Sequence, residues 1–99
     1  MQTYVFLAKL TDQGMRNIRK SPKRMSGGKK AAKQFGGRFR HWYLTIGMYD
    51  GVFVADFPDD KSAARFVLSR SANGNGRFTM LSAFSESQFP DLIKSLSPE

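Results

Sequence analysis

Few side chains in this sequence could do chemistry, and two of them stand together in a segment bracketed by glycines. Tyr49 and Asp50 lie within the run Gly47-Met48-Tyr49-Asp50-Gly51, where a phenol could donate a hydrogen bond and a carboxylate could act as a base. A carboxylate does so near neutral pH only when its pKa is raised. The alternative is a tight hairpin turn, because both residues of Asp50-Gly51 tolerate positive φ angles. We expect mainly the turn, and the pair could also form the rim of a pocket.

Three cations are candidates for binding an anionic ligand. Lys9 ends a predicted strand and Arg24 stands beside a helix restart at Ser21-Pro22, so both could face an anion at that helix N-terminus. Arg77 begins the last predicted strand, and Tyr43 is a further ligand-binding candidate in a middle strand. The alternative for the cations is a surface charge whose stem packs along apolar surface.

Composition excludes several classes of site. Cysteine is absent and histidine occurs once, which excludes disulfides, thiolate metal sites, thiol nucleophiles and multi-histidine metal clusters. The sequence holds no Ser-His-Asp set, phosphate loop or dinucleotide-binding motif. No apolar run reaches the ~18 residues of a membrane span, and the first residues lack signal-peptide features. We therefore expect a cytoplasmic protein with no metal site and no membrane-spanning segment.

The formal net charge is +8, from 16 Lys and Arg against 8 Asp and Glu. Most of the surplus lies in residues 16–40, which contain ten basic residues and no acidic one. Such a block attracts anions, whether nucleic acid, acidic lipid, phosphate metabolites or an acidic protein face. A solvated helix surface would have the same composition. Nonspecific nucleic-acid binding through residues 16–40 is therefore an alternative function, and it would weaken steeply with salt.

The elements that must position these residues follow from the hydrophobic pattern. Runs rich in aromatic and β-branched residues predict strands over residues 3–9, 38–46, 51–57 and 77–84. A first helix is expected to begin after Thr11, to kink or restart at Pro22 and to end at Gly36-Gly37, where a left-handed cap is possible. Gly27-Gly28 weakens this helix.

Two more helices follow. Pro58-Asp59-Asp60 stops the third strand and caps the second helix, and residues 73–76 end it. One side of this helix is predicted to carry Ala64, Val67, Leu68 and Ser71. A short C-terminal helix is predicted from the i, i+3, i+4, i+7 spacing of Phe89, Leu92, Ile93 and Leu96.

The element order is βαββαβ plus a C-terminal helix, which predicts one ferredoxin-like α+β domain over residues 1–99. Right-handed crossovers would place both main helices on one face of a four-stranded antiparallel sheet. A sheet with one face in water should alternate apolar and polar residues, but these strands are apolar on both sides. In the second strand, Trp42, Leu44 and Ile46 are expected to face away from Phe39 and Tyr43. We expect the second face to form a homodimer, and larger oligomers could build on it.

Several short motifs agree in order and spacing with one known family. They are Lys9-Leu10-Thr11, Gly14, Ser21-Pro22-Lys23-Arg24, Gly36-Gly37, Tyr43, Gly47-Met48-Tyr49-Asp50, Pro58-Asp59-Asp60 and Ala83-Phe84. From about Tyr4 to Phe89 the chain resembles the GYD domain proteins. The resemblance implies a small bacterial protein of the dimeric α/β barrel type and implies no particular biochemical activity. The sequence departs from the family in Ser26-Gly27-Gly28 and in the basic first helix.

Three functions remain open. The first is an oligomeric binding or regulatory domain that holds a small anionic or aromatic ligand between sheet and helices. The second is an enzyme in the same pocket, either cofactor-independent or haem-assisted; related barrels host such chemistry, and His41 would be the haem ligand or proton carrier. The third is nucleic-acid binding. Residues 5–10 are similar to the first-strand motif of RNA-recognition domains, but Asp50-Gly51-Val52 lacks the charge and the aromatic spacing of the partner motif, so this function is not favoured.

Overall fold

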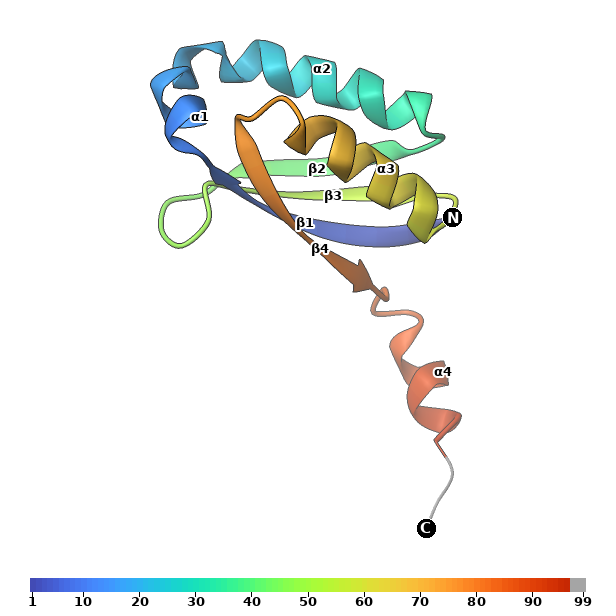
Figure 1. Ribbon diagram of the computed structural model, residues 1–99. Helices are drawn as coiled ribbons and strands as arrows, with labels where there is room; N and C mark the ends of the chain where they lie inside the picture. The colour runs from blue at the N-terminus through green and yellow to red at the C-terminus, as the bar shows by residue number, and fades with distance from the viewer. Residues whose placement is uncertain (97–99) are drawn as a thin grey trace.

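The computed structural model describes residues 1–96 as a four-stranded sheet with helices packed on one face (Figure 1). The elements in chain order are β1 (Gln2–Leu10), α1 (Asp12–Arg16), the 3-10 turn η1 (Ile18–Lys20), α2 (Ser21–Gln34), β2 (Arg38–Leu44), β3 (Gly51–Phe57), α3 (Asp60–Ser71), β4 (Gly76–Ala83) and α4 (Phe89–Lys94). The strands lie in the order β2-β3-β1-β4, and every neighbouring pair is antiparallel. The predicted ferredoxin-like α+β fold is confirmed.

Three helix ends lie where capping chemistry predicts them, whereas α2 begins at Ser21 with Lys20 as its N-cap and no side-chain cap. Thr11 and Asp59 are N-caps whose side chains accept hydrogen bonds from Gly14 N and Ser62 N. After α2, Gly36 has a φ of 78°, and the amides of Gly36 and Gly37 donate to Lys33 O and Ala32 O, which is a Schellman motif. The predicted first helix is divided into α1, η1 and α2, while α2 runs unbroken through Gly27 and Gly28.

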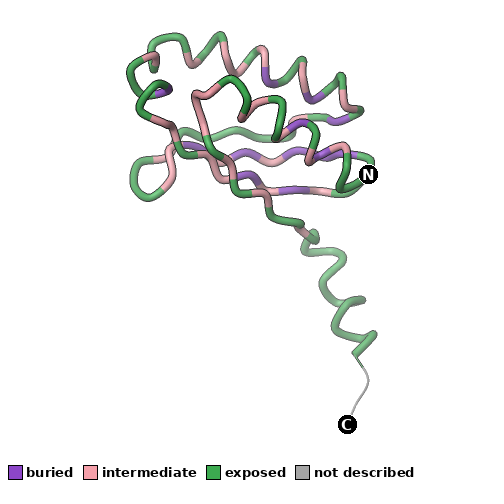
Figure 2. Tube along the Cα trace, viewed as in Figure 1, coloured by how far each residue is buried: buried purple, intermediate pink, exposed green. Residues whose placement is uncertain are grey.

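The core lies between the sheet and the two main helices. Figure 2 shows buried positions along β1 and β3 and on the sides of α2 and α3 that face them. The fully or almost fully buried hydrophobic residues are Tyr4, Phe6, Ala32, Phe53, Ala55, Phe57, Ala63 and Phe66. Phe53 stacks between Phe6 and Phe39, with ring centroids 4.6 and 4.9 Å apart. Stacked and edge-on aromatic pairs of this kind add to the free energy gained by burial.

The buried side of α3 differs from the prediction. Ala63 and Phe66 are the buried residues of this helix, whereas Leu68 is 68% exposed. The predicted stripe was displaced by about one residue, although one of its members, Val67, does pack against the core. With Phe66 inward, the residue one turn later on the same side is Arg70.

A β-bulge changes the faces of β2. Phe39 pairs with Ala55 and His41 pairs with Val54, so Arg40 is an extra residue between them. A bulge shifts the alternation of all later side chains by one position. Phe39 and Trp42 therefore share the helix-covered face, and the prediction that set Phe39 with Tyr43 on one face was wrong.

No helix of residues 1–96 covers the opposite face of the sheet (Figure 1). Cross-strand partners share a face, and the pairs Val5–Val54, Val5–Leu81 and Leu7–Val52 define an apolar group there. We call this group, Val5, Leu7, Val52, Val54 and Leu81, the open-face patch. Figure 1 also shows α4 projecting away from the sheet, and none of its residues is buried.

No helix within residues 1–96 is both long enough and apolar enough to cross a membrane.

Candidate functional site

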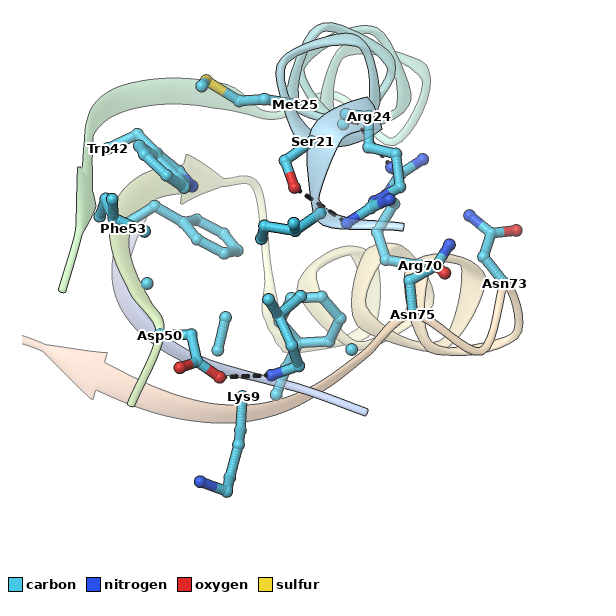
Figure 3. Close-up of a pocket in the computed structure, with 18 of the residues that line it drawn as sticks. Lys9, Ser21, Arg24, Met25, Trp42, Asp50, Phe53, Arg70, Asn73 and Asn75 are labelled. Atoms are coloured by element: carbon cyan, nitrogen blue, oxygen red, sulfur yellow. Dashed lines mark hydrogen bonds between the residues drawn. The ribbon is translucent and has the colours of Figure 1, made fainter. Parts of the chain in front are cut away.

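A cleft of ≈ 160 Å³ opens between the sheet and the helices α2 and α3 (Figure 3). Its floor is the helix-covered face of β1, β2 and β3, and its walls come from η1, α2, α3 and the start of β4. Most of the lining is apolar, and six of the large side chains are Ile18, Met25, Trp42, Phe53, Phe66 and Phe78. Concave sites with aromatic walls and a few polar groups are the usual form of a small-molecule site.

Two arginines form the cationic side of this cleft. Arg24 Nη1 donates to Asn17 O at 2.8 Å and Arg24 Nη2 donates to Ser21 Oγ at 3.0 Å. Arg70, from α3, donates from Nη2 to the carbonyl oxygen of Arg24 at 3.0 Å. Figure 3 shows both guanidinium groups on the same side of the cavity. The contacts with Asn17 and Ser21, at the start of α2, thus hold the guanidinium of Arg24 in place, and the carbonyl oxygen of Arg24 in turn holds Arg70.

The two positive charges affect each other. Burial, and then the charge of Arg24, lower the pKa of Arg70 from its ordinary value. Within residues 1–96 neither arginine forms an ion pair, since the ion pairs of that region both involve Asp56. The cleft therefore contains positive charge that no protein carboxylate of the described region neutralises.

Asp50 also lines the cleft, but its atoms have structural partners. Its Oδ2 accepts a hydrogen bond from Leu10 N at 2.8 Å, and its own N–H donates to Ala8 O at 2.8 Å. The expectation of a tight turn with positive φ at Asp50-Gly51 was wrong, since the positive φ of this connection lies at Gly47. Residues 45–50 form a longer loop, and Asp50 joins it to the end of β1.

Lys9 and Arg77 lie opposite each other on the open face, because their Cα atoms are cross-strand partners. Lys9 Nζ donates to Met48 O at 3.3 Å. Figure 3 shows the side chain of Lys9 pointing away from the cavity, so only the rest of this residue lines the cleft. The structure therefore does not bring Lys9 and Arg24 together around one anion.

Tyr43 and His41 are also on the open face. They pair with Val52 and Val54, and their rings lie 6.4 Å apart. A haem bound by His41 would consequently lie outside the cleft. Tyr49, in the loop before β3, accepts a hydrogen bond from Thr45 Oγ1 with its backbone oxygen. Of the residues predicted from the sequence, the cleft brings together the side chains of Arg24 and Asp50.

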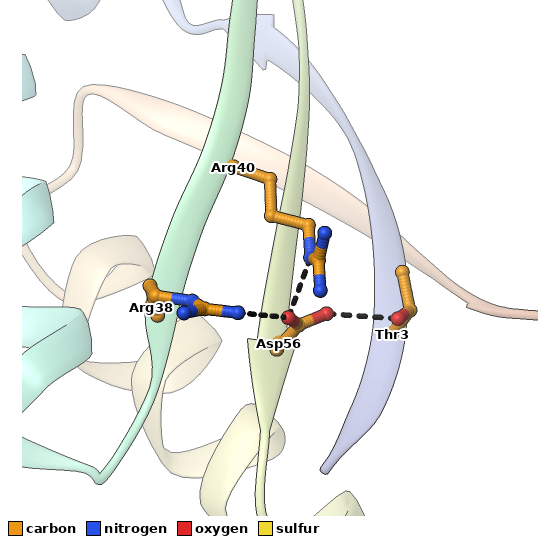
Figure 4. A network of polar contacts seen from close by, with 4 residues as sticks. All are labelled: Thr3, Arg38, Arg40 and Asp56. Atoms are coloured by element: carbon orange, nitrogen blue, oxygen red, sulfur yellow. Dashed lines mark hydrogen bonds and ion pairs between the residues drawn. The ribbon is translucent and has the colours of Figure 1, made fainter.

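The open face has one polar cluster of its own, at the end of β3 (Figure 4). Asp56 is 3% exposed, and its carboxylate accepts from Thr3 Oγ1 at 2.8 Å, from Arg38 at 3.4 Å and from Arg40. Burial by itself raises the pKa of Asp56, but the hydrogen bonds from Thr3 and Arg40 outweigh it and leave the pKa below its usual range. The bulge at Arg40 lets both arginines of β2 reach the same carboxylate.

Sequence reasoning missed Arg70, Asn73, Asn75 and Trp42 as cleft residues. The signal for Arg70 was present, because Ala63, Phe66 and Arg70 follow the i, i+3, i+7 spacing of one helix side. A charged residue on a buried stripe is unusual and normally needs a partner. Trp42 could be placed only with the bulge in β2, which the sequence does not reveal.

The described region, residues 1–96, has no group of three or more His, Asp or Glu side chains that could hold a metal ion. The basic residues of segment 16–40 lie mostly on η1 and the outward side of α2, where Lys23, Lys29, Lys30 and Lys33 are all exposed. Their charge is separate from the cleft, apart from Arg24. The site thus has two parts, a cleft with two cations and an uncovered sheet face.

Comparison with known proteins assigns the chain to a family. The profile of the GYD domain matches residues 4–93. A protein from Thermus thermophilus, called "Glutamine synthetase and cystathionine beta-lyase binding protein", is 31% identical over 84 residues, which are 84% of this chain and 88% of that protein. The predicted resemblance is confirmed, and the chain belongs to the GYD domain family.

Proposed function

We propose that this chain is a single-domain binding and regulatory protein that works as a homodimer, with larger assemblies built on that dimer. The observation that carries the proposal is the open-face patch, which no helix of residues 1–96 covers. Each large apolar side chain left in water forgoes ~1.5–3 kcal/mol of burial. A second copy of the same face supplies a matching apolar surface through a two-fold axis.

The dimer is tested by light scattering over the micromolar concentration range. We expect a dimer for the natural chain and a monomer for Leu81→Lys, because Leu81 is 45% exposed on the open face and a charge there opposes burial. Leu68→Lys is the matched control, since Leu68 is 68% exposed on the helix layer. A natural chain that is monomeric at every concentration refutes the dimer.

A second partner is an enzyme of amino-acid metabolism. The support is the printed name of the Thermus relative, together with an apolar loop end where Ile46 is 94% and Met48 is 77% exposed. Exposed apolar groups of this kind are typical of interaction surfaces. Purified glutamine synthetase and cystathionine β-lyase would be passed over the immobilised protein. We expect retention of at least one enzyme, with loss in Ile46→Ser; the absence of retention for both contradicts this partner class.

The cleft is proposed as the place where this regulator holds a small anionic or aromatic molecule. Arg24 and Asp50 are the predicted site residues that face such a ligand. Tyr43, His41 and Arg77 would contact the second copy of the chain, because they lie on the open face. Binding without turnover distinguishes this function from an enzyme in the same cleft, whether cofactor-independent or haem-assisted.

A further inference from the structure

We propose that the cleft binds a small monocarboxylate with one apolar ring, and that Arg24 and Arg70 hold its carboxylate. This inference deepens the proposed ligand-binding function and rests on it. It names the ligand class and adds Arg70, which sequence reasoning did not predict. Charge, size and the arrangement of polar groups each support it.

The guanidinium groups of Arg24 and Arg70 are two positive charges on the same side of the cleft (Figure 3). Like charges at close range disfavour each other, and partial burial removes water that would screen them. Both effects are visible at Arg70, whose pKa is lowered by burial and by Arg24. An anion between the two groups would remove the repulsion and satisfy the N–H donors that the contacts to Asn17, Ser21 and Arg24 leave free. A carboxylate fits the planar fork of arginine through paired hydrogen bonds.

The apolar walls of the cleft set the size of the ligand body that can be buried there. A cavity of ≈ 160 Å³ is close to the roughly 150 Å³ of an engineered apolar cavity that binds benzene. Trp42, Phe53 and Phe78 face this space, so a flat ring can pack on aromatic surface. The cleft therefore favours a ligand with one ring or a short branched body.

The polar groups fix the direction of the ligand. Figure 3 shows Asp50 on the opposite side of the cavity from Arg24 and Arg70, and Asn73 and Asn75 on the arginine side. The Asp50 carboxylate repels an anionic group placed near it, while the amides of the asparagines can donate hydrogen bonds. The carboxylate of the ligand is thus directed to the arginines, and its ring lies over Trp42 and Phe53.

The arginine pair is also held in place before any ligand arrives. Arg70 crosses α2 at the two glycines, where a Cβ on Gly28 would lie 3.8 Å from its Nε and a Cβ on Gly27 would lie 3.9 Å from its Nη1. Both distances are ordinary van der Waals contacts, so the guanidinium of Arg70 packs against this stretch of α2. Preorganised donors lose less conformational entropy on binding than free side chains do.

The test uses para-fluorophenylacetate as the probe and fluorine NMR of the full chain as the readout. Two comparison compounds separate the parts of the site. Para-fluorotoluene has the ring without the carboxylate. Inorganic phosphate has the charge without the ring and, because it contains no fluorine, is measured by its displacement of the probe. We expect the probe to bind at least tenfold more tightly than either, because both the charged hydrogen bonds and the ring burial contribute.

The variant arm replaces one cation by methionine, an unbranched neutral side chain that retains the apolar stem but not the guanidinium group. Arg70→Met should weaken probe binding about tenfold or more, whereas Arg65→Met, an exposed position on the same helix, should leave it unchanged. Arg24→Met provides a second variant if Arg70→Met does not fold. The assignment is overturned if all three compounds bind the natural chain equally tightly. It is also overturned if Arg65→Met weakens probe binding as much as the Arg24 or Arg70 variant does, so a folded Arg70 variant is not required.

Native mass spectrometry of the same samples keeps this inference separate from the proposed dimer. A natural chain that is dimeric but does not bind the probe refutes the ligand class and leaves the oligomer intact. A monomer that binds the probe through Arg70 refutes the dimer and leaves the ligand class intact.

Discussion

Asp50 shows how a single residue of a conspicuous motif can serve the backbone. Its carboxylate accepts from Leu10 N and its N–H donates to Ala8 O, so it extends the hydrogen bonding of β1 beyond the last sheet pairing. A partly buried N–H that loses its acceptor costs about 1–3 kcal/mol. We expect Asp50→Ala to lower the free energy of unfolding by about this amount, as measured by urea titration.

The matched variant is Asp50→Asn, which keeps an acceptor oxygen and should cost less than about 1 kcal/mol. It also removes the negative charge from the cleft, so probe binding should be unchanged or tighter. If the Ala and Asn variants are equally unstable, the charge of Asp50 matters rather than its acceptor, and the backbone role is wrong.

Asp56 is a different case, because its charge is used. Two arginines and Thr3 converge on a carboxylate that is 3% exposed. The arginine side chains are 66% and 48% exposed, so solvent weakens their contribution. We expect Asp56→Asn to lower the free energy of unfolding by about 1–2 kcal/mol at pH 7, while Asp91→Asn in exposed α4 changes it little.

The pH dependence of this effect has a definite sign. The pKa of Asp56 in the fold is lowered from its ordinary value of 3.8, so the unfolded chain takes up a proton first as pH falls. The stabilisation is therefore fully present above about pH 4 and is lost as the pH falls through the folded-state pKa. Urea titrations between pH 7 and pH 2 should show the difference between Asp56→Asn and the natural chain shrinking below pH 4. A constant difference over this range rules out the charge as its cause.

At the level of elements, the glycines of α2 and those that follow it have opposite roles. In the helix, a Cβ on Gly27 would meet only the end of Arg70, at 3.9 Å, and Ala is preferred over Gly by about 1 kcal/mol in a helix interior. After the helix, a Cβ on Gly37 would lie 2.3 Å from the ring of Phe57 and 2.9 Å from Asp56 O. Neither neighbour is the end of a flexible side chain.

We therefore expect Gly27→Ala to raise the free energy of unfolding by about 0.5–1 kcal/mol. Gly37→Ala should lower it by about 2 kcal/mol or more, since the buried ring and backbone must move. Urea titration of both variants measures the two effects. A destabilised Gly27→Ala would mean that the contact with Arg70 is tighter than an ordinary van der Waals contact.

The order of the elements could be predicted from the sequence, whereas two details of the site could not. Local signals mark three helix boundaries in the structure. Thr11 and Asp59 cap the starts of α1 and α3, and the glycines after α2 mark its end. The bulge at Arg40 and the path of residues 45–50 depend on tertiary contacts with β3 and β1 rather than on local signals in the sequence. For this reason Trp42 and Phe39 were assigned incorrectly to opposite faces, and Asp50 was assigned to a tight turn.

On the scale of the whole molecule, the distribution of charge separates two kinds of surface. The exposed lysines of α2 lie on the helix layer, and the open-face patch lies on the other side of the sheet. Nonspecific binding of nucleic acid through residues 16–40 would thus leave the open face free. Binding of this kind weakens with salt, whereas an apolar dimer interface does not.

The C-terminal helix α4 leaves its apolar side chains uncovered. Phe89, Leu92 and Ile93 are 60%, 41% and 50% exposed in α4, and none of its six residues is buried. A helix this short is unstable in water on its own, so its conformation requires a surface to pack on. Because α4 continues from β4 beyond the sheet, the second copy of the proposed dimer is the expected surface.

A chain shortened to residues 1–84 tests this expectation. We expect its free energy of unfolding, measured by urea titration at concentrations where both chains are monomeric, to stay within about 0.5 kcal/mol of that of the full chain, since residues 85–96 are all exposed. Its dimer should dissociate at a concentration at least tenfold higher, because three apolar side chains lose their partner. Ile93→Glu in the full chain should reproduce this shift, while Lys94→Glu should not. Equal dimer dissociation constants for the short and full chains would place the packing surface of α4 on a protein other than a second copy.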